Sequence, residues 1–232
     1  MESRLAIVDG RVEDSLIKAL SAYADAVFPF RSDGVTYNSI SCHPDIFIYQ
    51  DERNIILAPN APDTIKNHLQ EKGIPFKEGY SNIGTTQKDS CFYNCVSTST
   101  LLFHKPGYTD PLILEVNKGK KLIALPQSYT RCSMFAIDDS HFITSDPGIH
   151  NILEKEELPN ILFSPNEIRI IEHRYGFLGG TCGMVDNKML FLGNPLRHKD
   201  GKRLISFIEE NGKECISLGN NFLYDGGGIF FI

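Results

Sequence analysis

The residues in this sequence best suited to covalent chemistry are its cysteines and one histidine. In four places the residue just before a predicted β-hairpin is a cysteine, namely Cys42, Cys95, Cys132 and Cys182. If the hairpins repeat around an axis, these thiols converge on one central site together with His43. A thiol becomes a strong nucleophile when a nearby cation or imidazole lowers its pKa. The pattern therefore predicts a thiol site at the centre of the fold.

The sequence neighbours of these cysteines suggest roles within such a site. Arg131 directly precedes Cys132 and is expected to lower the pKa of its thiol, which favours Cys132 as the nucleophile. Cys182, in the glycine-rich segment 179–183, is the second candidate. His43 is the expected acid or base, and Asp45 or Asp225 would orient it. The residues expected to bind a substrate are Arg131, Asn94, Asp225 and Gly227.

Two other interpretations of the same thiols remain open. Cysteine is a small and often fully buried apolar residue, so the four thiols could simply fill a narrow axis. The thiols and His43 could also bind a metal ion, but the ligands would come from separate units and no local Cys-x-x-Cys pair is present. We therefore predict neither a metal nor a cofactor.

Self-similarity along the chain indicates which elements position these residues. Three segments share a strand–turn–strand pattern, and an amphipathic helical stretch follows each. The hairpins are residues 45–59, 133–146 and 183–194, the helices are 62–73, 147–158 and 201–211, and the closing strands after the last two helices are 168–171 and 215–218. The spacing of the turns leaves room for one further, degenerate unit. Its parts are a strand at 96–103, a turn at 105–107, a helix at 110–118 and a strand at 122–125.

A fifth unit is divided between the two ends of the chain. A strand at 5–8 and a helix at 12–24 begin the sequence, and residues 228–232 supply the missing first strand. Pairing the two ends would close the ring and protect both edges. The predicted fold is an α/β, five-bladed, pseudo-symmetric β/α propeller, closed by pairing of the N- and C-terminal strands, with residues 1–232 as one domain. The alternative is a two-layer α+β domain with similar hairpins.

Five such units around a pseudo-fivefold axis resemble the pentein fold of the guanidino-group-modifying enzymes. The segment Cys42-His43-Pro44-Asp45 resembles their Gly-His-x-Asp motif, which implies His43 as acid or base and Asp45, with Asp225, as a guanidinium ligand. The segment 225–228 resembles the glycine part of their nucleophile motif, but residues 230–232 (Phe-Phe-Ile) stand where the thiol should be. The patterns at 129–133, 145–149 and 176–180 are similar to an uncharacterised bacterial family of this fold.

The resemblance implies a thiol-dependent hydrolase or transferase of the amidinohydrolase or deiminase type. Its substrate would be a small guanidino, amidino or related cationic compound bound in a pocket on the pseudo-fivefold axis. The order of His43 and Cys132, two units apart, is similar to the order of histidine and cysteine in these enzymes. The alternative is a non-catalytic binding or interaction protein of the same fold, because the usual C-terminal thiol is replaced.

Composition limits the partners and the compartment. The 232 residues carry a net charge of −6 and no basic stripe, so nucleic acid is not an expected partner. No apolar run approaches the ~18–20 residues that a membrane span needs. The first residues lack the apolar stretch of a secretory signal, so we expect a reducing cytoplasm in which the six cysteines are free thiols. A small-molecule substrate is the expected partner, and the sequence leaves the oligomeric state open.

Overall fold

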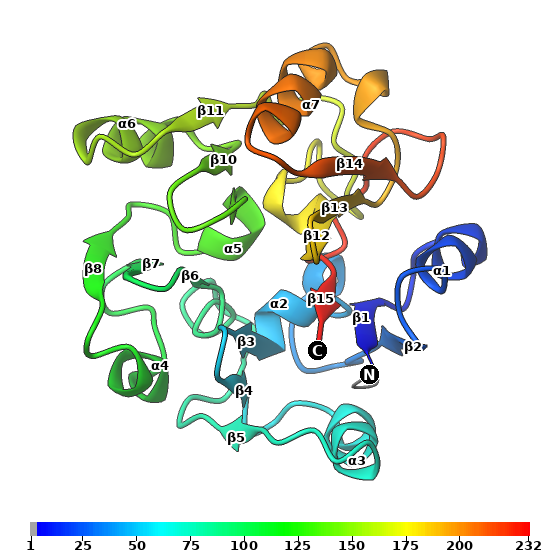
Figure 1. Cartoon of the computed structure of the whole chain (residues 1–232). Coiled ribbons are helices and arrows are strands. Elements are labelled where there is room, and N and C mark those ends of the chain that lie inside the picture. The colour runs from blue at the N-terminus through cyan, green and yellow to red at the C-terminus, as the bar shows by residue number, and fades with distance from the viewer. Residues whose placement is uncertain (1–3) are drawn as a thin grey trace.

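The computed structural model describes residues 4–232 and arranges them as five three-stranded sheets around a central axis (Figure 1). In each sheet the inner strand runs antiparallel to the central strand, and the outer strand runs parallel to it. A helix joins the central strand to the outer strand and lies at the periphery of the ring (Figure 1). Parallel pairing requires such a crossover, because the chain must travel back before it re-enters the sheet.

Each unit consists, in chain order, of an inner strand, a central strand, a crossover helix and an outer strand. The five units are β3 (Ile48–Gln50), β4 (Ile55–Leu57), α3 (Asp63–Glu71) and β5 (Lys77–Glu78); β6 (Val96–Ser97), β7 (Leu101–His104), α4 (Pro111–Val116) and β8 (Lys121–Ala124); β9 (Met134–Ala136), β10 (Phe142–Thr144), α6 (Pro147–Lys155) and β11 (Asn160–Leu162); β12 (Cys182–Val185), β13 (Lys188–Phe191), α7 (Gly201–Glu210) and β14 (Glu214–Ser217); and β15 (Phe230–Phe231), β1 (Leu5–Asp9), α1 (Asp14–Leu20) and β2 (Ala26–Phe30). The remaining short helices are η1 (Asn38–Ile40), α2 (Pro44–Phe47), α5 (Thr130–Ser133), η2 (Gly179–Thr181) and η3 (Pro195–Arg197).

The crossover helices are held by apolar residues one turn apart. Four of the five bury a pair at i and i+4, and the pairs are Leu16 and Leu20, Ile65 and Leu69, Ile149 and Leu153, and Leu204 and Ile208. This spacing places both side chains on the face of the helix that packs on its sheet. Burying each pair contributes about 3–6 kcal/mol before conformational entropy is subtracted.

The two ends of the chain meet in one sheet, as predicted. Strand β15 pairs antiparallel with β1, with Phe231 opposite Ala6 and Phe230 opposite Ile7. The backbones of Leu5 and Ile232 also exchange two hydrogen bonds, of 2.7 and 2.8 Å. Figure 1 shows both termini side by side near the axis. This pairing covers the inner edge of β1, which would otherwise be open to other strands.

Three predicted elements differ in the structure. Residues 45–47 form the helical turn α2 and not the start of a strand, because Pro44 at the first helical position has no N–H to lose and a backbone angle suited to a helix. Residues 96–103 form the hairpin of β6 and β7 and not one strand. The Thr98 hydroxyl accepts hydrogen bonds from the backbone N–H groups of Thr100 and Leu101 and so makes the turn.

The third difference concerns the strand that closes the unit of α6. That strand is β11 (residues 160–162) and not residues 168–171, because α6 ends at Lys155 and the first extended segment after it already reaches β10. Residue Arg169 makes only an isolated bridge with Tyr224. The outer strand β2 of the divided unit also has no counterpart among the predicted elements.

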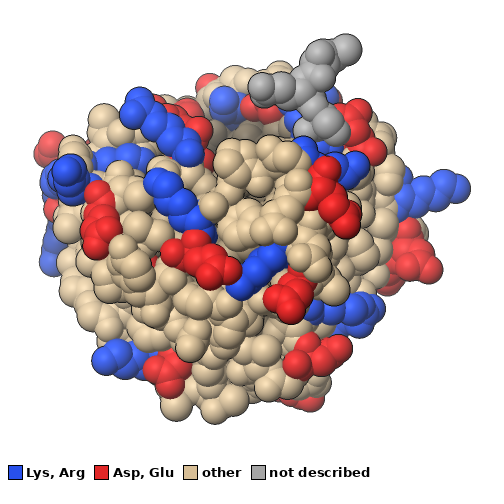
Figure 2. Space-filling view, turned by 90° about the horizontal axis from the view of Figure 1, so that it is seen from below, with Lys and Arg blue, Asp and Glu red and all other residues tan. Residues whose placement is uncertain are grey.

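Charges of both signs alternate over the face of the molecule shown in Figure 2. Lys and Arg side chains on that face lie next to Asp and Glu side chains, with uncharged surface between them. The crossover helices are short, and α7 has ten residues where a bilayer span needs ~20. None of the helices in residues 4–232 is long and apolar enough to span a bilayer.

Candidate active site

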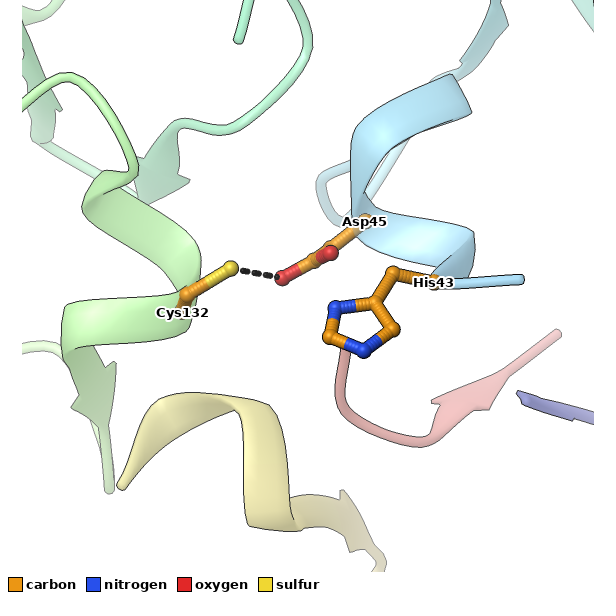
Figure 3. A group of neighbouring side chains, drawn as sticks. All are labelled: His43, Asp45 and Cys132. Atoms are coloured by element: carbon orange, nitrogen blue, oxygen red, sulfur yellow. Dashed lines mark hydrogen bonds between the residues drawn. The ribbon is translucent and has the colours of Figure 1, made fainter. Parts of the chain in front are cut away.

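His43, Asp45 and Cys132 lie together at the centre of the ring. Cys132 belongs to α5, whereas Asp45 belongs to α2 and His43 immediately precedes it (Figure 3). The Cys132 thiol donates a hydrogen bond of 2.8 Å to Oδ2 of Asp45. A ring nitrogen of His43, a carboxylate oxygen of Asp45 and Sγ of Cys132 all lie within 4.8 Å of one another. The fold therefore brings a thiol, a carboxylate and an imidazole from two distant segments into one buried site.

The sequence around Pro44 explains why His43 and Asp45 reach the same place. His43 has extended backbone angles (φ −77°, ψ 116°) and is the last residue before the helical turn. Its carbonyl accepts a hydrogen bond from the N–H of Ile46, which ties the residue to the turn that contains Asp45. The turn leads directly into the inner strand β3, so its residues face the axis. The equivalent turn α5 precedes β9 and holds Cys132 in the same way.

Asn94 connects the two turns. Its side-chain oxygen accepts a hydrogen bond from the N–H of Cys132 (3.1 Å). Its amide nitrogen lies 3.2 Å from the carbonyl oxygen of Asp45 and 3.3 Å from Sγ of Cys132. Asn94 is fully buried, so these contacts are protected from water. Asn94, which was expected to bind a substrate, therefore fixes the positions of Cys132 and Asp45 relative to each other in this structure.

Asp225 supplies a second carboxylate next to His43. Its Oδ1 lies 3.9 Å from Nδ1 of His43, and the side chain accepts hydrogen bonds from the N–H groups of Phe177 (2.8 Å) and Gly227 (3.2 Å). Gly227 has φ +68°, a conformation that glycine adopts at little cost. A Cβ there would lie 2.5 Å from Cβ of His43 and 2.7 Å from Oδ1 of Asp45. Gly227 thus lets the backbone close over both side chains.

Asp9 and Arg11 complete the surroundings of His43 and were not predicted. Oδ2 of Asp9 lies 3.8 Å from Nε2 of His43, so carboxylates flank both ring nitrogens. Arg11 clamps Asp9 through Nε and Nη2 at 3.0 and 2.7 Å. The one sequence signal was the charged residue Asp9 at the end of the wholly buried strand β1. Asp9 comes to His43 only because the ring closes between the two ends of the chain.

Burial suppresses charge throughout the cluster. It raises the pKa of Asp45 to about 6 and the pKa of Asp225 to about 7. It also lowers the pKa of His43 to about 3, so the imidazole is neutral at pH 7. Burial, together with the carboxylates of Asp45 and Asp225, raises the pKa of Cys132 well above its ordinary value. A cation bound among these groups would reverse the shifts of both carboxylates and of the thiol.

A pocket of about 660 Å³ reaches this cluster. His43, Cys132 and Asp225 line it together with the aromatic side chains of Tyr37 and Tyr129. Neither ring nitrogen of His43 has a hydrogen-bond partner, and neither does Oδ1 of Asp45, although all three atoms are buried. Buried polar atoms are rarely left unpaired, so a ligand that offers N–H groups would fit here.

Arg131 does not belong to the pocket. Its guanidinium donates to the backbone oxygens of Gly179 (2.5 Å) and Cys182 (3.2 Å) and lies 4.8 Å from the ring centre of Phe135. It lines a separate cavity of about 250 Å³ in which Cys132 has no part. The expectation that Arg131 lowers the pKa of Cys132 is therefore wrong, because the thiol faces two carboxylates and its pKa is raised.

Only one of the four cysteines reaches His43. Cys42 precedes α2, Cys95 immediately precedes β6, Cys132 lies within α5, and Cys182 begins β12, so the four thiols occupy different positions in their units. The Cys95 thiol lies 3.7 Å from Oγ1 of Thr109. The Cys182 thiol faces the carbonyls of Leu178 and Gly179, and burial raises its pKa to about 12. The predicted gathering of four sulfurs beside His43 is wrong, because Cys132 is the one of these four thiols that groups with His43 and Asp45 and lines the same pocket as His43.

The three clustered side chains are also of the types that bind zinc. Thiolate, imidazole and carboxylate groups are its usual protein ligands, and a fourth position stays open in catalytic sites. In residues 4–232 no other group of three such side chains lies close enough to share an ion. The geometry fits three ligands, but metal binding would occupy the thiol and so remove it as a free nucleophile.

Several solved structures resemble the whole ring at low sequence identity. Agmatine deiminase from C. jejuni has a TM-score of 0.62 at 8% identity, with 94% of this chain and 87% of that chain covered. DDAH from Pseudomonas aeruginosa, in complex with citrulline, has a TM-score of 0.54 at 10% identity, with 94% and 92% covered. An amidinotransferase from Microseira wollei has a TM-score of 0.54 at 10% identity, with 93% and 88% covered. These proteins share the pentein fold, which confirms the fold predicted from the repeats.

The family of the chain is also established. The chain belongs to the family of unknown function DUF6873, whose model matches residues 7–230. No curated protein matches the sequence. The chemistry of the site is therefore the main guide to the activity.

Proposed function

We propose that this protein is a thiol-dependent hydrolase or transferase for small guanidino or amidino compounds, with Cys132 as its nucleophile. The observation that carries the proposal is the thiol of Cys132, 2.8 Å from Asp45 and beside His43, on the floor of a pocket. The likeness of the ring to an agmatine deiminase and an amidinotransferase supports the same class of substrate.

The two carboxylates explain why a guanidinium would bind. The Asp225 carboxylate lines the pocket, and Asp45, whose Oδ1 is buried without a hydrogen-bond partner, lies directly behind His43 and Cys132. A planar guanidinium presents paired N–H donors that match carboxylate oxygens. Binding would offset part of the desolvation of both carboxylates, because each would ionise next to a positive charge. Affinity should therefore come from the charge of the ligand more than from its size.

The same ligand would activate the thiol. The Cys132 thiol keeps its proton and donates it to Asp45 in a hydrogen bond, and the pKa of the thiol is high. A guanidinium that occupies Asp45 takes away this hydrogen-bond acceptor and adds a positive charge beside the sulfur. Both changes favour the thiolate. The neutral imidazole of His43, with both nitrogens unpaired, is then available to accept the proton.

The covalent step follows from this arrangement. The Cys132 thiolate attacks the central carbon of the guanidinium, the C–N bond to the leaving group breaks, and His43 passes the thiol proton to the departing amine or ammonia. A thiouronium adduct remains on Cys132. In the hydrolase, water attacks the same carbon and the C–S bond breaks. One water proton returns to the sulfur and the other is released, leaving a urea-type product. In the transferase, an amine takes the place of water.

Affinity labelling tests the assignment of the nucleophile. 2-Chloroacetamidine mimics the planar cation and carries an alkylating carbon, whereas 2-chloroacetamide is its neutral counterpart. We expect the amidine to label Cys132 at least ~10-fold faster than the amide does, because the two carboxylates concentrate the cation at the thiol. Peptide mapping by mass spectrometry identifies the modified cysteine.

Two variants serve as controls for this labelling. Cys132→Ser should abolish the fast labelling, whereas Cys215→Ser should leave it unchanged, since Cys215 is partly exposed and lies outside the pocket. Fast labelling that survives in Cys132→Ser would refute the assignment.

A non-catalytic binding protein is the second candidate. Two observations favour it: the raised pKa of Cys132, and the residues Phe230 and Phe231 in place of a thiol after the glycine segment. In that case guanidinium compounds would bind with the same preference for charge. They would protect Cys132 from alkylation, but no substrate would release ammonia or an amine.

A further inference from the structure

The polar residues that line the pocket change in sign from its floor to its rim. At the floor, Asp225 reaches the pocket beside His43 and Cys132, and Asp45 lies behind them. At the rim, Arg174 lines the same pocket and is exposed to solvent. None of the ion pairs within residues 4–232 involves Arg174, so its positive charge is not neutralised by an acidic neighbour.

Arg174 is carried by a loop that is fixed to the floor. We define the rim loop as residues 169–176. Its base is closed by the N–H of Gly176, which donates to the carbonyl of Ile168 (2.9 Å). The next residue, Phe177, donates its N–H to Asp225 (2.8 Å). A second contact holds the loop near its tip, where Nε2 of His173 lies 3.0 Å from Oγ of Ser39.

This attachment limits the distance between the two charged ends of the pocket, Arg174 at the rim and Asp225 at the floor. Arg174 lies three positions before Phe177, and three residue steps span at most about 11 Å of chain. The backbone of Arg174 therefore stays within roughly that distance of the residue that contacts Asp225. The side chain of Arg174 can shorten the gap further. A short, linear molecule can thus touch both ends of the pocket at once.

The wall between floor and rim suits an aliphatic chain. Tyr37, Ile40, Tyr129, Ile170 and Phe177 line it. The hydroxyl groups of the two tyrosines bond to each other, and the hydroxyl of Tyr129 also bonds to Ser90, so these polar atoms are already satisfied. The remaining surface of this wall is mostly apolar and favours methylene groups.

We infer that the occupant of this pocket is a guanidino or amidino carboxylate, with its cationic head at Asp45 and Asp225 and its carboxylate at Arg174. This inference rests on the proposed function and narrows its substrate class. An arginine side chain is well suited to the role, because its planar fork binds a carboxylate through two parallel hydrogen bonds. Agmatine-like substrates, which carry a second cation in place of the carboxylate, are disfavoured by the same residue.

Binding of three matched ligands tests the inference. 4-Guanidinobutyrate, butylguanidine and agmatine share a guanidinium on a short chain and end in a carboxylate, a methyl group and an ammonium group. With the Cys132→Ser protein, which cannot turn them over, calorimetry should rank the carboxylate first and the ammonium last. We expect about a tenfold step in affinity between successive ligands at low salt.

Reversal of the charge of Arg174 provides a second test of the inference. Arg174→Glu should invert the order, so that agmatine binds best. Arg169→Glu is the matched control, because Arg169 is an exposed arginine of the same loop that does not line this pocket. It should keep the original order.

The possible failures are distinguishable. Equal binding of all three ligands, with no change in Arg174→Glu, would overturn the carboxylate assignment and leave the proposed function standing. If none of the three ligands binds, both the inference and the proposed function are wrong.

Discussion

The thiol of Cys132 and the carboxylate of Asp45 form a 2.8 Å hydrogen bond in which both partners are almost fully buried. The carboxylate raises the pKa of the thiol, and the hydrogen bond from the thiol opposes the effect of burial on the pKa of Asp45. The proton therefore rests on sulfur until a positive charge enters the site. Single substitutions in and around this pair can test separately the charge of Asp45, the transfer of the Cys132 proton and the packing around both side chains.

Asp45→Asn should remove the preference for cationic reagents. The amide can still accept a hydrogen bond from the thiol, but it has no charge to offer a guanidinium. A hydrogen bond to a charged group contributes about 1.5–3 kcal/mol, so labelling of Cys132 by 2-chloroacetamidine should slow ~10- to 100-fold. Labelling by neutral 2-chloroacetamide should not slow, because the loss of the carboxylate lowers the pKa of the thiol. Equal slowing of both reagents would mean that Asp45 has only a structural role.

His43→Gln should separate binding from chemistry. The glutamine preserves much of the volume of the ring but cannot accept the thiol proton as a base. In saturation kinetics of 2-chloroacetamidine labelling, the limiting rate should fall ~100-fold or more, while the half-saturating concentration changes little. A change confined to the half-saturating concentration would show that His43 only shapes the pocket.

Gly227→Ala should destabilise the protein more than a simple backbone effect explains. Gly34 offers a matched control, since it also has a positive φ (+78°) but an added Cβ there would meet nothing within 4 Å. Gly34→Ala should therefore lower the free energy of unfolding by about 1–2 kcal/mol. Gly227→Ala should cost at least ~1 kcal/mol more, because its Cβ collides with His43 and Asp45. Urea denaturation of both variants provides the comparison, and equal losses would contradict the packing.

Asp225→Asn should change how stability depends on pH. The pKa of Asp225 is raised to about 7 in the folded protein, whereas an unfolded aspartate titrates near 3.9. Between these values the folded state holds the proton more tightly, so this residue's stabilising contribution, complete at low pH, is lost as the pH rises through 7. Asparagine has no such loss.

The free energy of unfolding of Asp225→Asn, relative to wild type, should therefore improve by a few kcal/mol between pH 5 and pH 8. Urea denaturation at several pH values measures this difference. A constant offset between the two proteins would mean that the carboxylate titrates normally.

The repeating framework could be predicted because its signals are local. Four of the five crossover helices show their buried face through a pair of apolar residues such as Ile65 and Leu69, and three of the hairpins show two apolar runs around a turn. Pairing of the two ends also followed from the repeats, since one unit lacked its first strand. The helices and hairpins depend on neighbours in the sequence, and the pairing of the ends follows from the number of units, so these features can be predicted without knowledge of the folded contacts.

The directions of the side chains at the axis could not be predicted in the same way. Arg131 and Cys132 are adjacent in the helical turn α5, where successive residues are rotated by about 100°. They consequently face different cavities, and adjacency in sequence gave the wrong partner for the thiol. Asp9 was missed for a related reason, because its approach to His43 depends on contacts between segments distant in the sequence.

The most direct test is the pKa of Cys132 with and without a bound guanidinium. The ultraviolet absorbance of the thiolate can be followed against pH, taking the difference between wild type and Cys132→Ser to isolate this one thiol. Saturating methylguanidine should lower the pKa of Cys132 by at least ~2 units, because a positive charge beside the sulfur favours the thiolate. If the pKa of Cys132 is the same with and without methylguanidine, a cation in the pocket does not activate the thiol and the proposed chemistry is wrong.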